Sequence, residues 1–223
     1  MQAGNANYQS ESDLPDTVGL FPLAGALLLP GGNLPLNIFE PRYLSLIEDT
    51  ICGNKVLGMI QPRLDQQDSD EEPALCQLGC LGRITAWRET GDGQCLINVT
   101  GIARFELLRE AEGLRGYRRA AISVIGEDLD DQEEAAKEVD RDELLRTLKA
   151  FLEANDLEAD WEGVEEAPTD LLVNSLSMLS PYGPAEKQAL LEARDLKTRA
   201  QTLVAITEVA LAKEAGGSTT TLQ

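Results

Sequence analysis

The sequence predicts an α+β protein in which a mainly antiparallel β domain is followed by a small α-helical subdomain. From Val18 to about Ile125, short apolar or alternating runs are separated by glycine and proline, which is the pattern of β-strands and their turns. At Gly126 the composition changes: residues 1–125 carry 10 basic and 16 acidic groups, whereas residues 126–223 carry 9 and 23. Beyond that point apolar residues recur at three- and four-residue steps, which indicates helices.

These changes divide the chain into four segments. Residues 1–13 are polar and are expected to form a disordered N-terminal tail. Residues 14–125 form the expected β domain and residues 126–213 the helical subdomain. Residues 214–223, rich in glycine, serine and threonine, are expected to form a disordered C-terminal tail.

Within the β domain, each apolar or alternating run is an expected strand. The run at residues 55–61 is almost continuously apolar, so we expect a central, buried strand there. Asp92-Gly93 lies between two alternating runs and predicts a β-hairpin that turns at residues 90–93. The expected strands are residues 18–21, 26–29, 34–39, 55–61, 80–89, 94–100, 101–109 and 118–125.

Proline and aspartate mark the starts of the expected helices. Pro41 opens a helix inside the β domain, because the first turn has no use for the N–H that proline lacks. Its apolar face runs from Tyr43 to Ile51, and it ends at about Cys52. In the subdomain, an acidic stretch leads into a helix around residues 144–152, helices follow at residues 169–179 and 185–191, and Asp195 caps a last one.

The net charge of −20, from 19 basic and 39 acidic residues, weighs against nucleic-acid and membrane-surface partners. A surface this acidic repels phosphate backbones and anionic lipid heads. Arg115, Arg118 and Arg119 form the only local basic cluster, which is small for an RNA-binding module. No apolar run approaches the roughly 18 residues that a spanning helix needs, and no secretory signal is apparent. We therefore expect a cytoplasmic protein.

The chain contains no histidine, so catalytic units that use imidazole as a base cannot be built from it. We find no phosphate-binding loop, dinucleotide fingerprint or nucleophile elbow, and no convincing Ser–Lys dyad. The four cysteines (Cys52, Cys76, Cys80 and Cys95) are interpreted as small buried hydrophobes, with a four-sulfur zinc site as the alternative. The carboxylates of residues 63–74 lack the register of a Ca²⁺ loop and predict a solvated loop. No metal or cofactor is expected.

The junction before the Pro41 helix carries the candidate binding residues Phe39, Glu40, Arg42 and Tyr43. Glu40 and Arg42 are two residues apart, a spacing at which side chains on a helix do not face each other. Each is therefore expected to fasten a neighbouring segment, with ligand contact as the alternative. No catalytic residue is assigned.

Several motifs resemble the N-terminal, substrate-binding domain of Lon proteases. The specific stretches are Leu20-Phe21-Pro22-Leu23, Leu29 to Tyr43 (LPGGNLPLNIFEPRY), Gly58 to Pro62 (GMIQP), Gly101 to Phe105 (GIARF), Ala159-Asp160-Trp161 and Glu186 to Glu192 (EKQALLE). The resemblance covers about residues 14–213 and implies a PUA-like β-barrel or sheet followed by a helical bundle. It also implies that Phe39 and Tyr43 anchor helix to sheet and that the motif positions are mostly framework, namely Pro22, Pro30, Gly31, Pro35, Phe39, Glu40, Pro41, Arg42 and Tyr43. A shallow apolar groove that could hold an extended segment is the alternative.

The resemblance implies a non-catalytic module that binds unfolded polypeptide or a partner protein, in an adaptor or chaperone-like role linked to proteolysis. The sequence ends before an ATPase module or a Ser–Lys proteolytic domain, so we expect a stand-alone member without enzymatic activity. One alternative is a small-molecule-binding or hydrolytic enzyme that uses carboxylates such as Glu40 in a cleft. Another is RNA binding by analogy of the PUA-like fold, which the charge opposes. The oligomeric state is left open.

Overall fold

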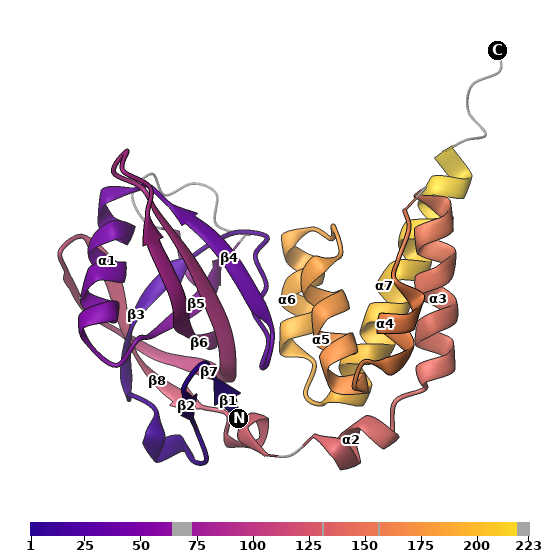
Figure 1. The fold of residues 1–223 in the computed structure, drawn as a ribbon, viewed down its shortest axis with the longest axis horizontal. Coiled ribbons are helices and arrows are strands. Elements are labelled where there is room, and N and C mark those ends of the chain that lie inside the picture. Colours follow the sequence, from indigo (N-terminus) through magenta and orange to yellow (C-terminus); the bar gives the residue numbers. More distant parts are fainter. Residues whose placement is uncertain (64–72, 131, 156, 218–223) are drawn as a thin grey trace.

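The chain forms a β part and a helical part that lie side by side (Figure 1). The computed structural model describes residues 1–63, 73–130, 132–155 and 157–217. The strands are β1 Gln2–Ala3, β2 Ala6–Asn7, β3 Thr17–Pro22, β4 Asn33–Ile38, β5 Val56–Pro62, β6 Leu75–Glu89, β7 Cys95–Leu114 and β8 Tyr117–Val124. The helices are α1 Pro41–Cys52, α2 Glu133–Lys137, α3 Arg141–Ala154, α4 Trp161–Glu166, α5 Thr169–Leu179, α6 Pro184–Glu192 and α7 Leu196–Gly217, with single 3₁₀ turns at Glu11–Asp13 and Gly126–Leu129.

The main sheet has the strand order β4-β7-β6-β5-β3-β8, and β8 also pairs with β7. The pairing therefore closes through β7, β6, β5, β3 and β8, while β4 is attached to the first half of β7. Only β3 and β5 run parallel among the paired strands described. The α+β class with a mainly antiparallel β-barrel and a group of helices is confirmed.

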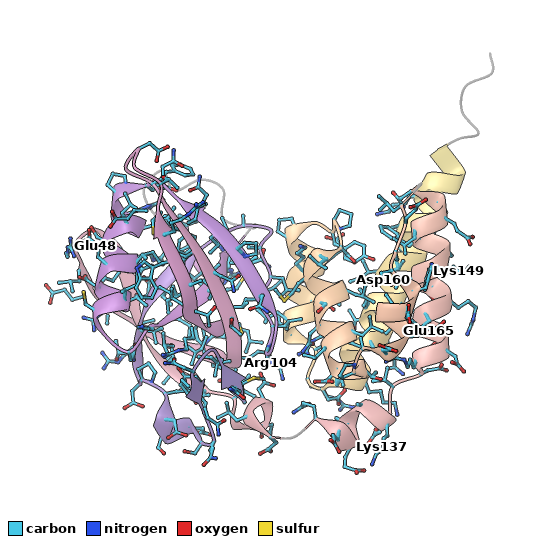
Figure 2. The ribbon with its side chains drawn as sticks, in the orientation of Figure 1. Glu48, Arg104, Lys137, Lys149, Asp160 and Glu165 are labelled. Carbon is cyan, nitrogen blue, oxygen red and sulfur yellow. The ribbon has the colours of Figure 1, made fainter. Side chains whose placement is uncertain are left out.

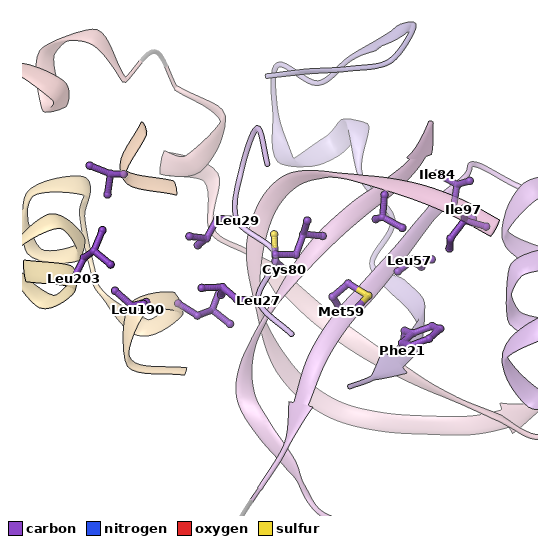
Figure 3. Packing of buried hydrophobic residues seen from close by; sticks show 14 of the residues in the cluster. Phe21, Leu27, Leu29, Leu57, Met59, Cys80, Ile84, Ile97, Leu190 and Leu203 are labelled. Carbon is purple, nitrogen blue, oxygen red and sulfur yellow. The ribbon is translucent and has the colours of Figure 1, made fainter. Parts of the chain in front are cut away.

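Two apolar clusters hold these elements together. One lies within the barrel and contains Leu20, Leu81, Ile102 and Phe105. The other extends from the sheet and α1 into the helical part, so that Leu27 and Leu29 lie between the sheet and Leu190 and Leu203 (Figure 3). Burying apolar surface is the main stabilising force of folding. The helical part thus completes a core that the β part begins.

The apolar run at residues 26–29 was expected to be a strand, but it is a buried irregular segment. Leu27, Leu28 and Leu29 are each at most 2% exposed. The segment passes so close to β7 that a Cβ on Gly101 would lie 2.1 Å from the Leu29 carbonyl oxygen. Its side chains fill the space between the two parts of the molecule, and the run is apolar for that reason.

Two further expectations about the β part were wrong. The expected strands 94–100 and 101–109 are one continuous strand, β7. Its pairing with β6 shifts register between Leu81 and Gly82, as at a β-bulge. Residues 1–13 are not a disordered tail: β1 and β2 pair, and Ala3 and Tyr8 are buried in the barrel cluster. The burial of Ala3 and Tyr8 could not be predicted because the residues around them are mostly polar.

The hairpin turn, α1 and α5 lie where the sequence predicts them, whereas α4 was not predicted as a helix.

The Asp195 cap is confirmed, since its Oδ1 accepts a hydrogen bond of 2.7 Å from the backbone N–H of Thr198. Helix α7 continues to Gly217, beyond the expected start of the C-terminal tail, and residues 218–223 lie outside the described residues. Most of the acidic stretch at residues 63–74 lies outside them as well. No helix in the described part of the chain is both long and apolar enough to span a membrane.

A groove between helix α1 and the β6–β7 hairpin

The junction before α1 brings Glu40 and Arg42 together. The Nε and Nη2 atoms of Arg42 donate to Oε2 of Glu40 at 3.0 and 2.9 Å. The expectation that the two side chains do not face each other was wrong, because Glu40 is the residue before the helix and has an extended backbone (φ −73°, ψ 131°). Both side chains are almost half exposed, so the pair lies on the surface and not in a cleft.

Tyr43 and Phe39 have opposite environments. The Tyr43 ring stacks on Phe21 with ring centres 4.3 Å apart, and its hydroxyl donates to the Pro22 carbonyl at 3.3 Å. Burial raises the pKa of this hydroxyl. Tyr43 therefore anchors α1 to β3, whereas Phe39 is 63% exposed and anchors nothing. Ile38 takes the core position instead, and alternation along the strand turns Phe39 outward.

An apolar hollow next to α1 lies beside these four residues, not on them. It is a groove of about 490 Å³ between α1 and the β6–β7 hairpin. Leu44, Ile47 and Ile51 line it from the helix, and Trp87 and Cys95 line it from the sheet. We call this hollow the α1 groove. Its volume lies in the range of about 300–1,000 Å³ that is usual for ligand sites.

Trp87 is the most distinctive side chain of the α1 groove. It is paired with the buried Ile97, so both point to the face that α1 covers, yet Trp87 itself is 47% exposed. The Nζ of Lys55 lies 4.8 Å from the centre of its ring, a cation–π contact that holds the indole in place. Lys55 has a left-handed backbone (φ 66°), which only a few per cent of non-glycine residues adopt.

The hairpin turn forms one end of the α1 groove. Gly91 and Gly93 both line it, and both have a φ of 84°, the left-handed region that glycine enters without steric cost. A Cβ placed on either glycine would meet no atom within 4 Å. The turn therefore leaves this end of the groove open. The sequence showed the hairpin but not the groove, because the two walls, α1 and the hairpin residues from Trp87 onward, are far apart along the chain.

Two other hollows involve the helical part. A cavity of about 20 Å³ between α3, α5 and α7 has room for about one water molecule. A hollow of about 340 Å³ separates β5 from α6, but Gln61 bridges it by donating to the Pro184 carbonyl and to Gln188, both at 3.1 Å. These contacts fasten the two parts of the molecule to each other.

The four cysteines differ in exposure, and two arginines of the basic cluster form ion pairs. Cys80 and Cys95 are buried, Cys76 is half-buried, and Cys52, at the end of α1, is exposed, so the expectation of four buried thiols was wrong for Cys52. Across the described ranges, no three metal-ligating side chains gather at one point. In the basic cluster, Arg115 is paired with Glu48 and Asp49, and Arg118 with Glu110.

The family profile described as "ATP-dependent protease La (LON) substrate-binding domain" matches residues 17–208. The chain belongs to this family. Both walls of the α1 groove, residues 44–52 and 87–95, lie within the matched region of this Lon substrate-binding domain. The sequence motifs from Leu20 to Glu192 thus led to the correct family.

Two relatives illustrate the match. Lon protease 2 of Myxococcus xanthus is 28% identical over 200 residues, which are 85% of this chain and 23% of that protein. Lon protease of Parabacteroides distasonis is 30% identical over 207 residues, 86% of this chain and 24% of that protein. The chain therefore spans about a quarter of the length of these relatives.

Solved structures support the fold. A Lon N-terminal domain protein from Xanthomonas campestris superimposes with a TM-score of 0.60 and 23% identity, over 85% of this chain and 97% of that one. The N-terminal domain of the Mycobacterium avium complex Lon protease superimposes with a TM-score of 0.63 and 20% identity, over 86% of this chain and 98% of that one. The match is to the substrate-binding domain of Lon, not to its catalytic domain.

Proposed function

We propose that this Lon substrate-binding domain binds unfolded polypeptide segments, or an exposed segment of a partner protein, in the α1 groove. The observation that carries the proposal is an apolar groove with a half-exposed tryptophan held on its wall. Tryptophan anchors of this kind dominate the energy of protein interfaces. The role would be that of an adaptor or chaperone-like partner in proteolysis. The family description supports its coarser part, the binding of a substrate.

The dimensions of the α1 groove suit an extended segment. It follows α1 from Leu44 to Cys52, eight residue steps that span about 12 Å at 1.5 Å per residue. An extended chain rises by about 3.3 Å per residue, so about three to four residues would fit. Phe39, exposed at the end of β4 whose last residue pairs with Cys95, would extend the apolar contact at one end.

Strand addition at the β4 edge has less support than binding in the groove. Among the described strands β4 pairs only with β7, so its other side is an open edge. However, Pro35 lies in the middle of β4 and has no N–H to donate, which is a common protection of edge strands. Binding also has more support than catalysis, because Glu40 lies on the surface beside Arg42.

A fluorescence-polarisation titration with a labelled, permanently unfolded polypeptide tests the proposal. We expect saturable binding that weakens by about tenfold or more in Trp87→Ala, in line with the loss of an interface anchor. Phe39→Ala should weaken it less. Leu179→Ala is the matched control, because Leu179 is also a large exposed apolar side chain, at 80%, but lies at the end of α5. Tyr43→Ala is unsuitable, since Tyr43 is part of the core.

A second readout is local to the α1 groove. Cys52 lines the groove and is exposed, so a bound segment should protect its thiol from alkylation. Protection that Trp87→Ala abolishes would support the proposal. Saturable binding that Trp87→Ala and Leu179→Ala affect equally, or that leaves Cys52 unprotected, would place the polypeptide elsewhere.

A further inference from the structure

The charged groups around the α1 groove are mainly acidic. Glu48 and Glu89 line it, and Asp49 and Asp92 are adjacent in sequence to groove residues. Three cations, Lys55, Arg88 and Arg115, offset these four carboxylates only in part. Arg88 lies on the opposite face of β6 from Trp87 and Glu89. Glu48 projects from α1 on the side of the molecule away from the helical part (Figure 2).

Lys55 and Arg115 are already engaged with the protein. Arg115 donates to Glu48 at 2.7 Å and to Asp49 at 2.8 Å. Lys55 lies over the ring of Trp87. Glu89, in contrast, forms no ion pair with any other described residue. Glu89 is therefore the carboxylate of the groove that is available to a ligand.

Glu89 and Trp87 are on the same face of β6. Their cross-strand partners are Cys95 and Ile97, which are both buried beneath α1, whereas Arg88 between them pairs with the exposed Leu96. Residues two apart in a strand are separated by about 7 Å on one face. An extended ligand has the same period, so a side chain placed on Trp87 would put the side chain two positions away near Glu89.

We propose, on the basis of the proposed function, that the α1 groove selects extended segments in which a large apolar residue and a Lys or Arg are two positions apart. The apolar side chain contacts Trp87 and the cation pairs with Glu89. The net charge of −20 adds a long-range attraction for cationic segments. The pair with Glu89 supplies the preference for spacing.

Three unstructured, labelled peptides that differ at one position test the proposal. Each carries a Leu, and the residue two positions after it is Lys, Ser or Glu in an otherwise uncharged sequence. At low salt we expect the Lys peptide to bind about two- to fivefold more tightly than the Ser peptide, the range of a partly exposed ion pair. The Glu peptide should bind more weakly than the Ser peptide. High salt should reduce these differences.

Two variants separate the local pair from the overall charge. Glu89→Gln should remove most of the preference for Lys while the Ser peptide binds as before. Glu153→Gln changes the net charge by the same amount on the exposed side of α3, and should keep the preference. A further peptide with Lys three positions from Leu should lose the advantage.

The outcomes distinguish this inference from the proposed function. If the Ser peptide binds and Trp87→Ala weakens it, but Lys and Glu make no difference or Glu89→Gln leaves the preference intact, the groove binds polypeptide and the charge selection is wrong. If none of the peptides binds, including the Ser peptide, both proposals are wrong.

Discussion

Arg104 and Asp128 form a buried ion pair at the junction of the two parts of the molecule. Nε and Nη2 of Arg104 each lie 2.8 Å from a different carboxylate oxygen of Asp128, and the two side chains are 5% and 10% exposed. Nη1 of Arg104 donates to the carbonyls of Leu191 and Ala193 between α6 and α7. One guanidinium thus connects β7, the turn at 126–129 and the helical part (Figure 2).

Removing the carboxylate should destabilise the fold strongly. Asp128→Ala leaves Arg104 buried with an uncompensated charge, and we expect a loss of about 3–5 kcal/mol in the free energy of unfolding. Urea denaturation followed by circular dichroism measures it. The control is Glu134→Ala, which breaks an exposed pair with Lys137 and should leave the urea midpoint almost unchanged. Equal effects of the two substitutions would contradict the assigned role of Asp128.

Gly101→Ala should be poorly tolerated although Gly101 lies in a strand. Its Cβ would lie 2.1 Å from the Leu29 carbonyl oxygen, a backbone atom that moves only with the whole 26–29 segment. We expect a loss of about 1–3 kcal/mol or more, measured by thermal denaturation. For comparison, a Cβ on Gly113, also in β7, would come no closer than 3.2 Å to the Tyr117 carbonyl. A Gly101→Ala protein as stable as Gly113→Ala would show that the 26–29 segment is not packed in this way.

The cysteines should differ in reactivity. Cys52 is exposed, whereas burial raises the pKa of the Cys80 thiol and makes the reactive thiolate rare. With Ellman's reagent we expect Cys52 to react rapidly in the folded protein and Cys80 only after unfolding in urea. The Cys52→Ser variant should lack the fast phase. A fast phase that persists in this variant would contradict the expected order of reactivity.

Acid should weaken the attachment of α1 to β8. The hydroxyl of Tyr117 donates to Asp49 at 2.9 Å, and this hydrogen bond, with that of Arg115, lowers the pKa of the Asp49 carboxyl. Because the pKa of Asp49 is lower in the folded than in the unfolded state, its contribution is fully present above about pH 5 and is lost as the pH falls through the folded-state pKa. Unfolding by urea at pH 7, 5 and 3 measures this.

Asp49→Asn is the matched variant for this titration. It should be less stable than the parent at pH 7, and the difference between the two proteins should shrink as the pH falls, because the parent carboxyl then becomes protonated. A difference between the two proteins that is the same at every pH would show that the charge of Asp49 does not contribute.

The accuracy of the sequence-based predictions depended on whether a feature is local. The bounds of α1 and α5 and the hairpin turn follow from proline positions, apolar spacing and Asp92-Gly93, which are rules within one element. Residues 26–29 and Phe39 were misassigned because apolar character does not show whether a side chain meets a strand partner, a distant helix or solvent. The division at residue 126 into a β domain and a helical subdomain stays a prediction.

The α+β class, the order of most elements and the membership of the Lon substrate-binding domain family could all be predicted from the amino-acid sequence. The tertiary structure alone decided that Trp87 lies across a groove from α1, that Arg104 meets Asp128 and the α6–α7 turn, and that Glu40 meets Arg42. The physical reason is that pairing and packing between elements set these contacts. Periodicity within an element shows which face is apolar, but chain closure and burial decide what that face meets.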